Sequence, residues 1–243
     1  TVDTTKITSI TIDASTALDT SKFGTSTALS ITGSSTRDIL TGNNGADTLN
    51  GGAGSDILSG GNGNDTLIGG EGSDHIVGGA GADIINLTET TSVADYVVYA
   101  AFTDGSAAGA AAGTFTGYDV ITGFKAGTDK VVFDSAYVND GAVATAIADG
   151  AVVVKASDAA TDAAKDLTAA DITNVDKVVA FLAEAGVAYT ASNNMNDVVA
   201  ITFGDKSALY AVLDADNNGV SAGEIKLLGT VDAVLTATDL LVA

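Results

Sequence analysis

Residues 33–86, cut every nine residues, read GSSTRDILT, GNNGADTLN, GGAGSDILS, GGNGNDTLI, GGEGSDHIV and GGAGADIIN. Position six is always aspartate, position eight is always leucine or isoleucine, and glycine fills positions one, two and four of the last four copies. A glycine-rich linker has no reason to keep an aspartate and an aliphatic residue in fixed phase. The six copies therefore predict a repeated structural unit. The aspartates are Asp38, Asp47, Asp56, Asp65, Asp74 and Asp83.

Each nonapeptide combines a tight turn with a short strand. The glycines let the backbone adopt positive φ and reverse direction. The next three residues predict a strand whose central side chain points to one face and whose neighbours point to the other. Two nonapeptides then complete one coil of a flattened solenoid with a narrow aliphatic core between two parallel sheets. One Leu or Ile per nine residues does not offset an ordering entropy of about 1–2 kcal/mol per residue, so the coils need a further source of stability.

The aspartates indicate that this source is calcium. In the solenoid they form two rows, with Asp38, Asp56 and Asp74 on one edge and Asp47, Asp65 and Asp83 on the other. Carboxylates this close repel one another, and a hard dication with oxygen ligands turns the repulsion into attraction. Ca²⁺ suits such turns better than Mg²⁺, and transition metals are disfavoured because the region has one histidine and no cysteine. The turn residues predicted to surround the ions are Gly45, Gly51, Gly52, Ala53, Gly54, Gly60, Gly61, Asn62, Gly63, Gly69, Gly70, Gly72, Gly79 and Gly81.

The pattern G-G-x-G-x-D-x-U-x, where U is aliphatic, resembles the calcium-binding nonapeptide of the RTX family. The resemblance implies a parallel β-roll, bound Ca²⁺ and export by a type I secretion apparatus. The first copy departs from the pattern, because Ser34 and Thr36 replace two glycines and Arg37 precedes the aspartate. We expect weak calcium binding, or none, in that copy.

Composition excludes several classes of partner. The 243 residues carry 10 basic and 31 acidic side chains, a formal net charge of −21. This charge disfavours nucleic acid and anionic membranes, and divalent cations are its natural counter-ions. The chain has no cysteine for disulfides and no run of about 18 apolar residues, which argues against membrane insertion. It has no initiating Met and no conventional leader, so we expect the C-terminal part of a longer protein.

We expect an all-β dominated fold in four parts, with residues 1–32 as an irregular lead-in to the β-roll of residues 33–86. Residues 87–134 form a cap, in which 96–102 is a strand over the open end and 118–134 holds two strands. The segment 118–134 resembles the closing segment of RTX rolls in secreted proteases. Within it we expect Asp119 and Asp129 to hydrogen-bond the turns, with metal binding as the alternative. Residues 135–243 form a small α+β module, with a helix at 174–185 and strands at 197–203, 208–214 and 224–231.

Two features of this last part leave alternatives open. Asp214, Asp216 and Asn218 occupy positions one, three and five of an EF-hand-like loop, but Glu224 falls one residue short of its usual place. The loop either binds Ca²⁺ or is an Asx-rich hairpin turn. The final residues 239–242, aspartate followed by three aliphatics, resemble the ends of type I secreted RTX proteins, and a plain strand is the alternative.

No catalytic motif is present, so we do not expect an enzyme: H-E-x-x-H and G-x-S-x-G are both missing. His75, at an outward-pointing repeat position, is expected on the surface. The composition, rich in Ala, Thr, Val and Gly, resembles bacterial surface-layer proteins. We favour a structural, calcium-binding region of such a protein, secreted to the cell surface, with copies of itself and the secretion apparatus as partners. The alternative is the folding and secretion module of a type I secreted protease, lipase or adhesin.

Overall fold

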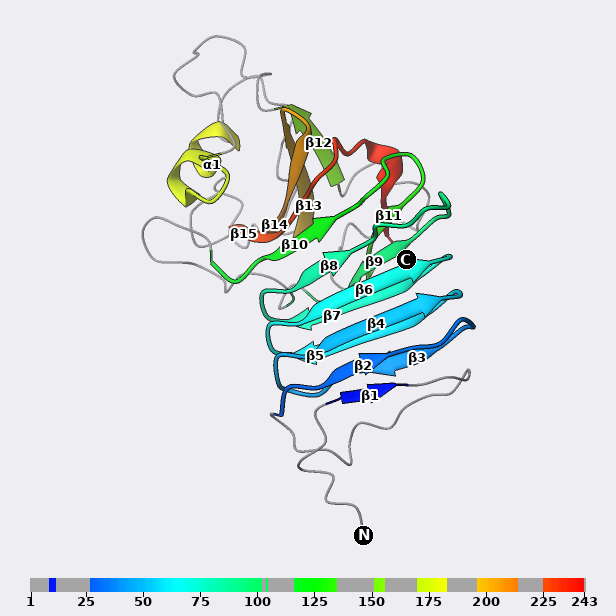
Figure 1. Cartoon of the computed structure of the whole chain (residues 1–243). Coiled ribbons are helices and arrows are strands. Elements are labelled where there is room, and N and C mark those ends of the chain that lie inside the picture. Colours follow the sequence, from blue (N-terminus) through cyan, green and yellow to red (C-terminus); the bar gives the residue numbers. More distant parts are fainter. Residues whose placement is uncertain are drawn as a thin grey trace.

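The computed structural model describes residues 9–11, 27–101, 104, 116–134, 151–155, 170–182, 196–213 and 225–242. Strands dominate these residues, and most of them run parallel in two sheets that face each other (Figure 1). The predicted parallel β-roll is therefore confirmed.

Successive strands of the roll alternate between the two sheets, so that each coil gives one strand to each sheet. The first sheet begins with β1 (Ser9–Thr11), β2 (Ser30–Thr32), β4 (Thr48–Ala53), β6 (Thr66–Glu71), β8 (Ile84–Asn86) and β10 (Asp119–Thr122). The second sheet holds β3 (Ile39–Thr41), β5 (Ile57–Asn62), β7 (His75–Ala80), β9 (Tyr96–Tyr99) and β11 (Lys130–Phe133). Strands β4 to β7 are six residues long because pairing continues through the two glycines that open the next nonapeptide.

The aliphatic residue at position eight of each nonapeptide lies in the core between the sheets. Leu58 pairs with Leu40 on one side and with Ile76 on the other, so these side chains stack from coil to coil. Each is fully buried, which confirms the narrow aliphatic core. The side chains that form these two stacks are Ile31, Leu49, Leu67, Ile85, Ile121 and Val231 in one sheet, and Leu40, Leu58, Ile76, Val97, Val131 and Leu240 in the other.

The coils continue past the last nonapeptide. The sequence led us to expect that strand β9 covers the open end of the roll, and this prediction is wrong. Strand β9 pairs in parallel with β7 and forms the next rung. Strands β10 and β11, the two expected within 118–134, extend the two sheets by a further coil. The roll therefore continues beyond residue 86, because Val97, Ile121 and Val131 extend its core.

The last rung comes from residues far along the chain. Strand β15 (Ile225–Val231) pairs in parallel with β10, and β16 (Leu240–Val242) pairs in parallel with β11. A 3-10 helix, Ala237–Asp239, precedes β16. The boundary expected at residue 134 therefore does not coincide with a break in either sheet.

The remaining described elements build a second core beside this end of the roll. Strands β14 (Lys206–Leu213) and β13 (Asn196–Phe203) continue the first sheet in antiparallel pairing, and β12 (Ala151–Lys155) ends it. Helix α1 (Val175–Leu182) lies beside these strands (Figure 1), and its buried apolar residues share one core with theirs. The helix and three strands expected from the sequence are thus confirmed. No helix among the described residues is long and apolar enough to cross a membrane.

Candidate calcium sites between the coils

The position-six aspartates form two columns that run along opposite edges of the roll. In each column, Oδ1 of one aspartate accepts a hydrogen bond from the backbone N–H of the aspartate one coil earlier, as in the 2.8 Å bond from Asp56 N to Asp74 Oδ1. The first column contains Asp38, Asp56, Asp74, Asp95 and Asp129. The second column contains Asp47, Asp65, Asp83 and Asp119. The predicted coil-to-coil stacking of the aspartates is present in this structure.

These carboxylates are buried side by side, which disfavours their charged form. All nine are at most 1% exposed. Burial, with added repulsion from neighbouring carboxylates, raises the pKa of Asp65 to about 7 and that of Asp74 and Asp83 to about 6. Such groups need a counter-charge near neutral pH.

In each of the last four nonapeptides, one carboxylate oxygen of the aspartate has no hydrogen-bond partner. Among the described residues, Oδ2 of Asp56, Asp65, Asp74 and Asp83 accepts no hydrogen bond and is buried. A buried carboxylate oxygen without a donor is costly, and a cation is the group that satisfies it.

In the first two nonapeptides, donors from the protein satisfy that carboxylate oxygen. Ser34 donates both its N–H, at 2.6 Å, and its hydroxyl, at 2.9 Å, to Oδ2 of Asp38. Asn43 donates its N–H to Oδ2 of Asp47 at 2.6 Å, and Leu29 donates to the other oxygen of that aspartate. In these copies a serine or asparagine stands at position two, where the other four have glycine. Protein donors thus satisfy both oxygens of Asp47 but only Oδ2 of Asp38, whose Oδ1 is buried without a partner. This arrangement favours the weak calcium binding expected of the first copy and extends it to the second.

Glycine at position one leaves the space in which a metal would be bound. A Cβ built on Gly51 would lie 2.5 Å from Asp56 Oδ2 and 2.5 Å from the Gly69 carbonyl oxygen of the next coil. These two oxygens therefore face one small space that only glycine keeps open. Gly33, Gly42 and Gly60 stand in the same relation to their own aspartate and to the glycine carbonyl one coil on.

The other predicted turn residues hold neighbouring coils together. In the last four copies the glycines at positions two and four have positive φ, and a Cβ on any of them would overlap the backbone of the coil below. Gly45 lacks the positive φ, but a Cβ there would lie 2.9 Å from the backbone of Thr27. Ala53 and Asn62 donate their N–H groups to the carbonyls of Ser34 and Asn43, each at 3.1 Å. The glycines with these roles are Gly52, Gly54, Gly61, Gly63, Gly70, Gly72, Gly79 and Gly81.

The sequence analysis did not identify Asp95, and it did not place Asp119 and Asp129 in the aspartate columns. Each of the three precedes its core residue by two positions, as in Asp95-Tyr96-Val97, and that triplet is the signal by which they are recognisable. The expectation that Asp119 and Asp129 hydrogen-bond the turns is confirmed, since they accept from Asp83 N at 2.9 Å and from Asp95 N at 3.1 Å. His75 is exposed, as expected, and stacks on Tyr96 with ring centroids 4.6 Å apart.

The donor set fits calcium. Unpartnered carboxylate oxygens and turn carbonyls are the hard ligands that Ca²⁺ takes in variable geometry. Within the described residues, no three His, Cys, Asp or Glu side chains converge as a metal cluster. A site in this roll therefore combines one or two aspartates with main-chain oxygens. Asp56, Asp65, Asp74 and Asp83 carry the free oxygens for it.

The second predicted site lies outside the described residues. Asp214, Asp216, Asn218 and Glu224 all belong to the segment between β14 and β15, so calcium binding there stays a prediction.

Comparison with known families agrees with this geometry. The family model described as RTX calcium-binding nonapeptide repeat (4 copies) matches residues 32–67 and residues 59–88. No curated protein matches the chain. The matched residues contain all six predicted aspartates and end seven residues before Asp95, where the pattern of glycines has stopped. Residues 32–88 are therefore RTX calcium-binding nonapeptide repeats.

Proposed function

We propose that this chain is the calcium-binding structural region of a secreted bacterial surface-layer protein, which folds and assembles when it meets Ca²⁺ outside the cell. The observation that carries the proposal is the set of four buried, unpartnered oxygens on Asp56, Asp65, Asp74 and Asp83. Repeats of this kind occur in secreted proteins, where calcium is more abundant than in the cytosol.

Calcium binding supplies the stability that the thin core lacks. Without the ion, the folded roll would hold two columns of close, buried carboxylates, and the unfolded chain would keep them apart in water. Binding free energy then becomes folding free energy, as in other small metal-dependent folds. Low cytosolic calcium keeps the chain unfolded for export by a type I apparatus, and external calcium folds it afterwards.

The surface-layer role rests on composition and charge. The chain is rich in Ala, Thr, Val and Gly, has no cysteine, and carries a formal charge of −21 that opposes contact between copies. Calcium in the roll removes part of that charge, and ions at exposed acidic turns bridge one molecule to the next. The proposed role is structural, not enzymatic, and the partners are copies of the protein itself.

Assembly separates this proposal from a folding and secretion module of a protease, lipase or adhesin. For the whole protein that carries this chain, we expect two calcium midpoints on one sample. Circular dichroism reports folding at the lower one, and light scattering reports sheet formation at the higher one. Electron microscopy of the scattering sample should show ordered two-dimensional sheets. A folded protein that stays monomeric at millimolar calcium would rule out the surface-layer role and leave the secretion module.

A further inference from the structure

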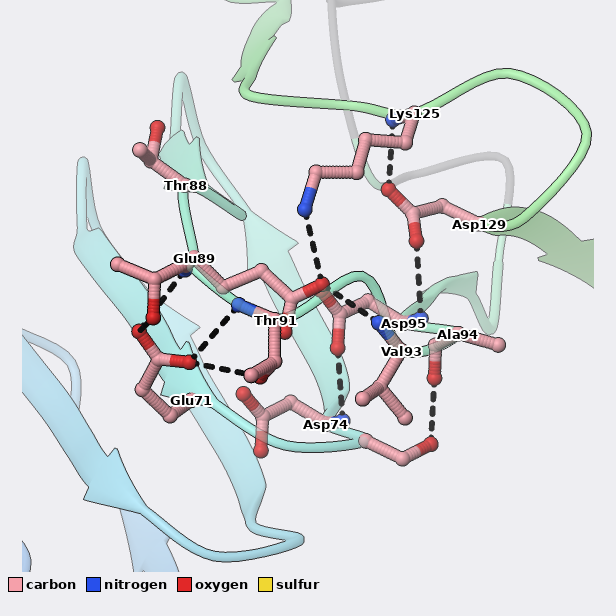
Figure 2. A network of polar contacts seen from close by, with 12 residues as sticks. Glu71, Asp74, Thr88, Glu89, Thr91, Val93, Ala94, Asp95, Lys125 and Asp129 are labelled. Atoms are coloured by element: carbon pink, nitrogen blue, oxygen red, sulfur yellow. Dashed lines mark hydrogen bonds and ion pairs between the residues drawn. The ribbon is translucent and has the colours of Figure 1, made fainter.

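The turn between β8 and β9, residues 87–95, breaks the pattern of the nonapeptides. Aspartates in one column are 18 residues apart up to Asp74, but Asp74 and Asp95 are 21 apart, so the turn has three additional residues. It contains no glycine. Besides Asp95 it contains one acidic residue, Glu89, whose side chain is only 1% exposed because it folds inward toward the aspartate column (Figure 2).

Below this turn, the space beside Gly69 differs from that in the lower coils. In the lower coils, the position-one glycine and its aspartate face the carbonyl of the next position-one glycine, as Gly51 and Asp56 face Gly69. Around Gly69, the three nearest groups are two atoms of Asp74 and one of Ile76, the farthest at 3.3 Å, and no carbonyl of the next coil is among them. No next-coil carbonyl therefore lies as close to this position as in the lower coils, and the same holds at Gly78 beside Asp83.

Glu89 brings a carboxylate near Asp74 and Asp95 (Figure 2). Its Oε1 accepts from Val93 N at 2.8 Å and from Lys125 Nζ at 3.1 Å. Its Oε2 is buried and, among the described residues, accepts no hydrogen bond. The same holds for Oδ2 of Asp74 and Oδ2 of Asp95. Three buried carboxylate oxygens from two consecutive coils thus lack partners in one region.

Electrostatics shows that these groups act on one another. Burial raises the pKa of Asp95 to about 7 and that of Asp74 to about 6, and the charge of Glu89 contributes to both increases. Asp129 accepts two N–H groups, from Asp95 and from Lys125, one on each carboxylate oxygen. The four carboxylates and the Lys125 ammonium together carry a formal charge of −3, most of which one dication offsets.

We propose that Glu89 is a ligand of an additional calcium ion at this turn, outside the nonapeptides, where its Oε2 takes the place of a turn carbonyl. No three acidic side chains converge among the described residues, so Glu89 shares the ion with one of Asp74 and Asp95 and with main-chain oxygens. Lys125 donates to Oε1 of Glu89, as Figure 2 shows, and at the proposed site it competes with calcium for this carboxylate. The site does not depend on whether the protein forms a surface layer.

Counting bound ions tests this site. In native mass spectrometry of the 243-residue chain at saturating calcium, Glu89→Gln should carry one ion fewer than the wild type and keep the same circular dichroism. Glu71→Gln is the matched control, because Glu71 lies beside the same turn and the substitution removes the same charge. Its oxygens already accept from Thr90 and Thr91 at 2.7–3.2 Å, so it should keep the full count. An unchanged count in Glu89→Gln overturns the proposal.

A second variant decides the matter if Glu89→Gln does not fold. Lys125→Met removes the competing ammonium, so one calcium ion should bind about tenfold more tightly or better. If Lys125 is instead the permanent counter-ion of Glu89, the variant will lose thermal stability in calcium with every ion affinity unchanged, and the proposal fails. Calcium bound to the repeats but insensitive to both variants would contradict only this additional site.

Discussion

Position two of each nonapeptide decides which group the aspartate carboxylate meets. Where the residue is Ser34 or Asn43, its N–H donates to Oδ2 and the oxygen is satisfied by protein. Where it is glycine, as at Gly52 with φ +99°, the N–H does not reach the carboxylate and Oδ2 of Asp56 stays free. One change of residue type thus separates a hydrogen-bonded turn from a turn that is open to calcium.

Two matched variants test this distinction. Asp56→Asn removes a free charged oxygen, so we expect the loss of at least one bound ion and a lower calcium affinity. Asp47→Asn removes a carboxylate that already accepts two N–H bonds, so we expect an unchanged ion count and a loss of about 1–3 kcal/mol of stability. Ion counting and urea unfolding in calcium measure the two effects. Equal losses of ions in both variants would contradict the role of position two.

The sequence predicted the stacked aspartates of the nonapeptides because their phase is local, but it could not reveal the buried carboxylate of Glu89. Each repeat aspartate precedes its aliphatic residue by two positions, and alternation along the strand places both. The inward direction of Glu89 depends instead on a three-residue insertion and on Lys125, which lies 36 residues away in sequence. Such a contact has no periodic signature.

Among the elements, the aspartate columns are as continuous as the sheets. Each column joins consecutive coils through bonds of 2.6–3.1 Å between a backbone N–H and a carboxylate. Strands β9, β10 and β11 were recognisable as strands from their β-branched and aromatic residues. Their role as further rungs of the roll was not recognisable from the sequence. The segments before β9 and β10 differ in length from the repeat, and strand pairing depends on contacts between residues far apart in sequence.

The columns predict an unusual pH dependence for the calcium-free chain. Burial raises the folded-state pKa of Asp65 to about 7 and that of Asp119 to about 8, above an unfolded value of about 3.9. Between these values the folded state binds more protons than the unfolded state, so stability is greatest near pH 4 and falls as the pH rises to 8. Glu71, whose pKa hydrogen bonds from Thr90 and Thr91 lower to about 2, acts outside this window.

Circular dichroism in excess chelator, recorded between pH 5 and pH 8, measures this dependence as the folded fraction. We expect what folded fraction exists without calcium to be largest near pH 5 and to fall toward pH 8, and saturating calcium to remove most of this slope because it replaces the protons. A folded fraction in chelator that rises with pH over this range would mean that the columns are not buried together as carboxylates.

For the whole molecule, the last rung ties the α+β part to the roll. Asp232 accepts the N–H groups of Gly123 and Phe124 at 2.8 and 3.2 Å, and Asp239 accepts the N–H of Gly127 at 2.6 Å. Both aspartates thus bind the turn between β10 and β11 from more than 100 residues away. Local sequence patterns predicted β15 as a strand, but its pairing with β10 could not be derived from them. We expect the roll and this part to fold together.

The central claim is that calcium, not the thin core, holds the roll in its folded state. Far-ultraviolet circular dichroism of the 243-residue chain, first in excess chelator and then in millimolar calcium, tests it most directly. We predict a largely disordered spectrum in chelator and a cooperative gain of β signal on adding calcium, with no comparable gain from magnesium at the same ionic strength. The same β content with and without chelator would contradict the claim.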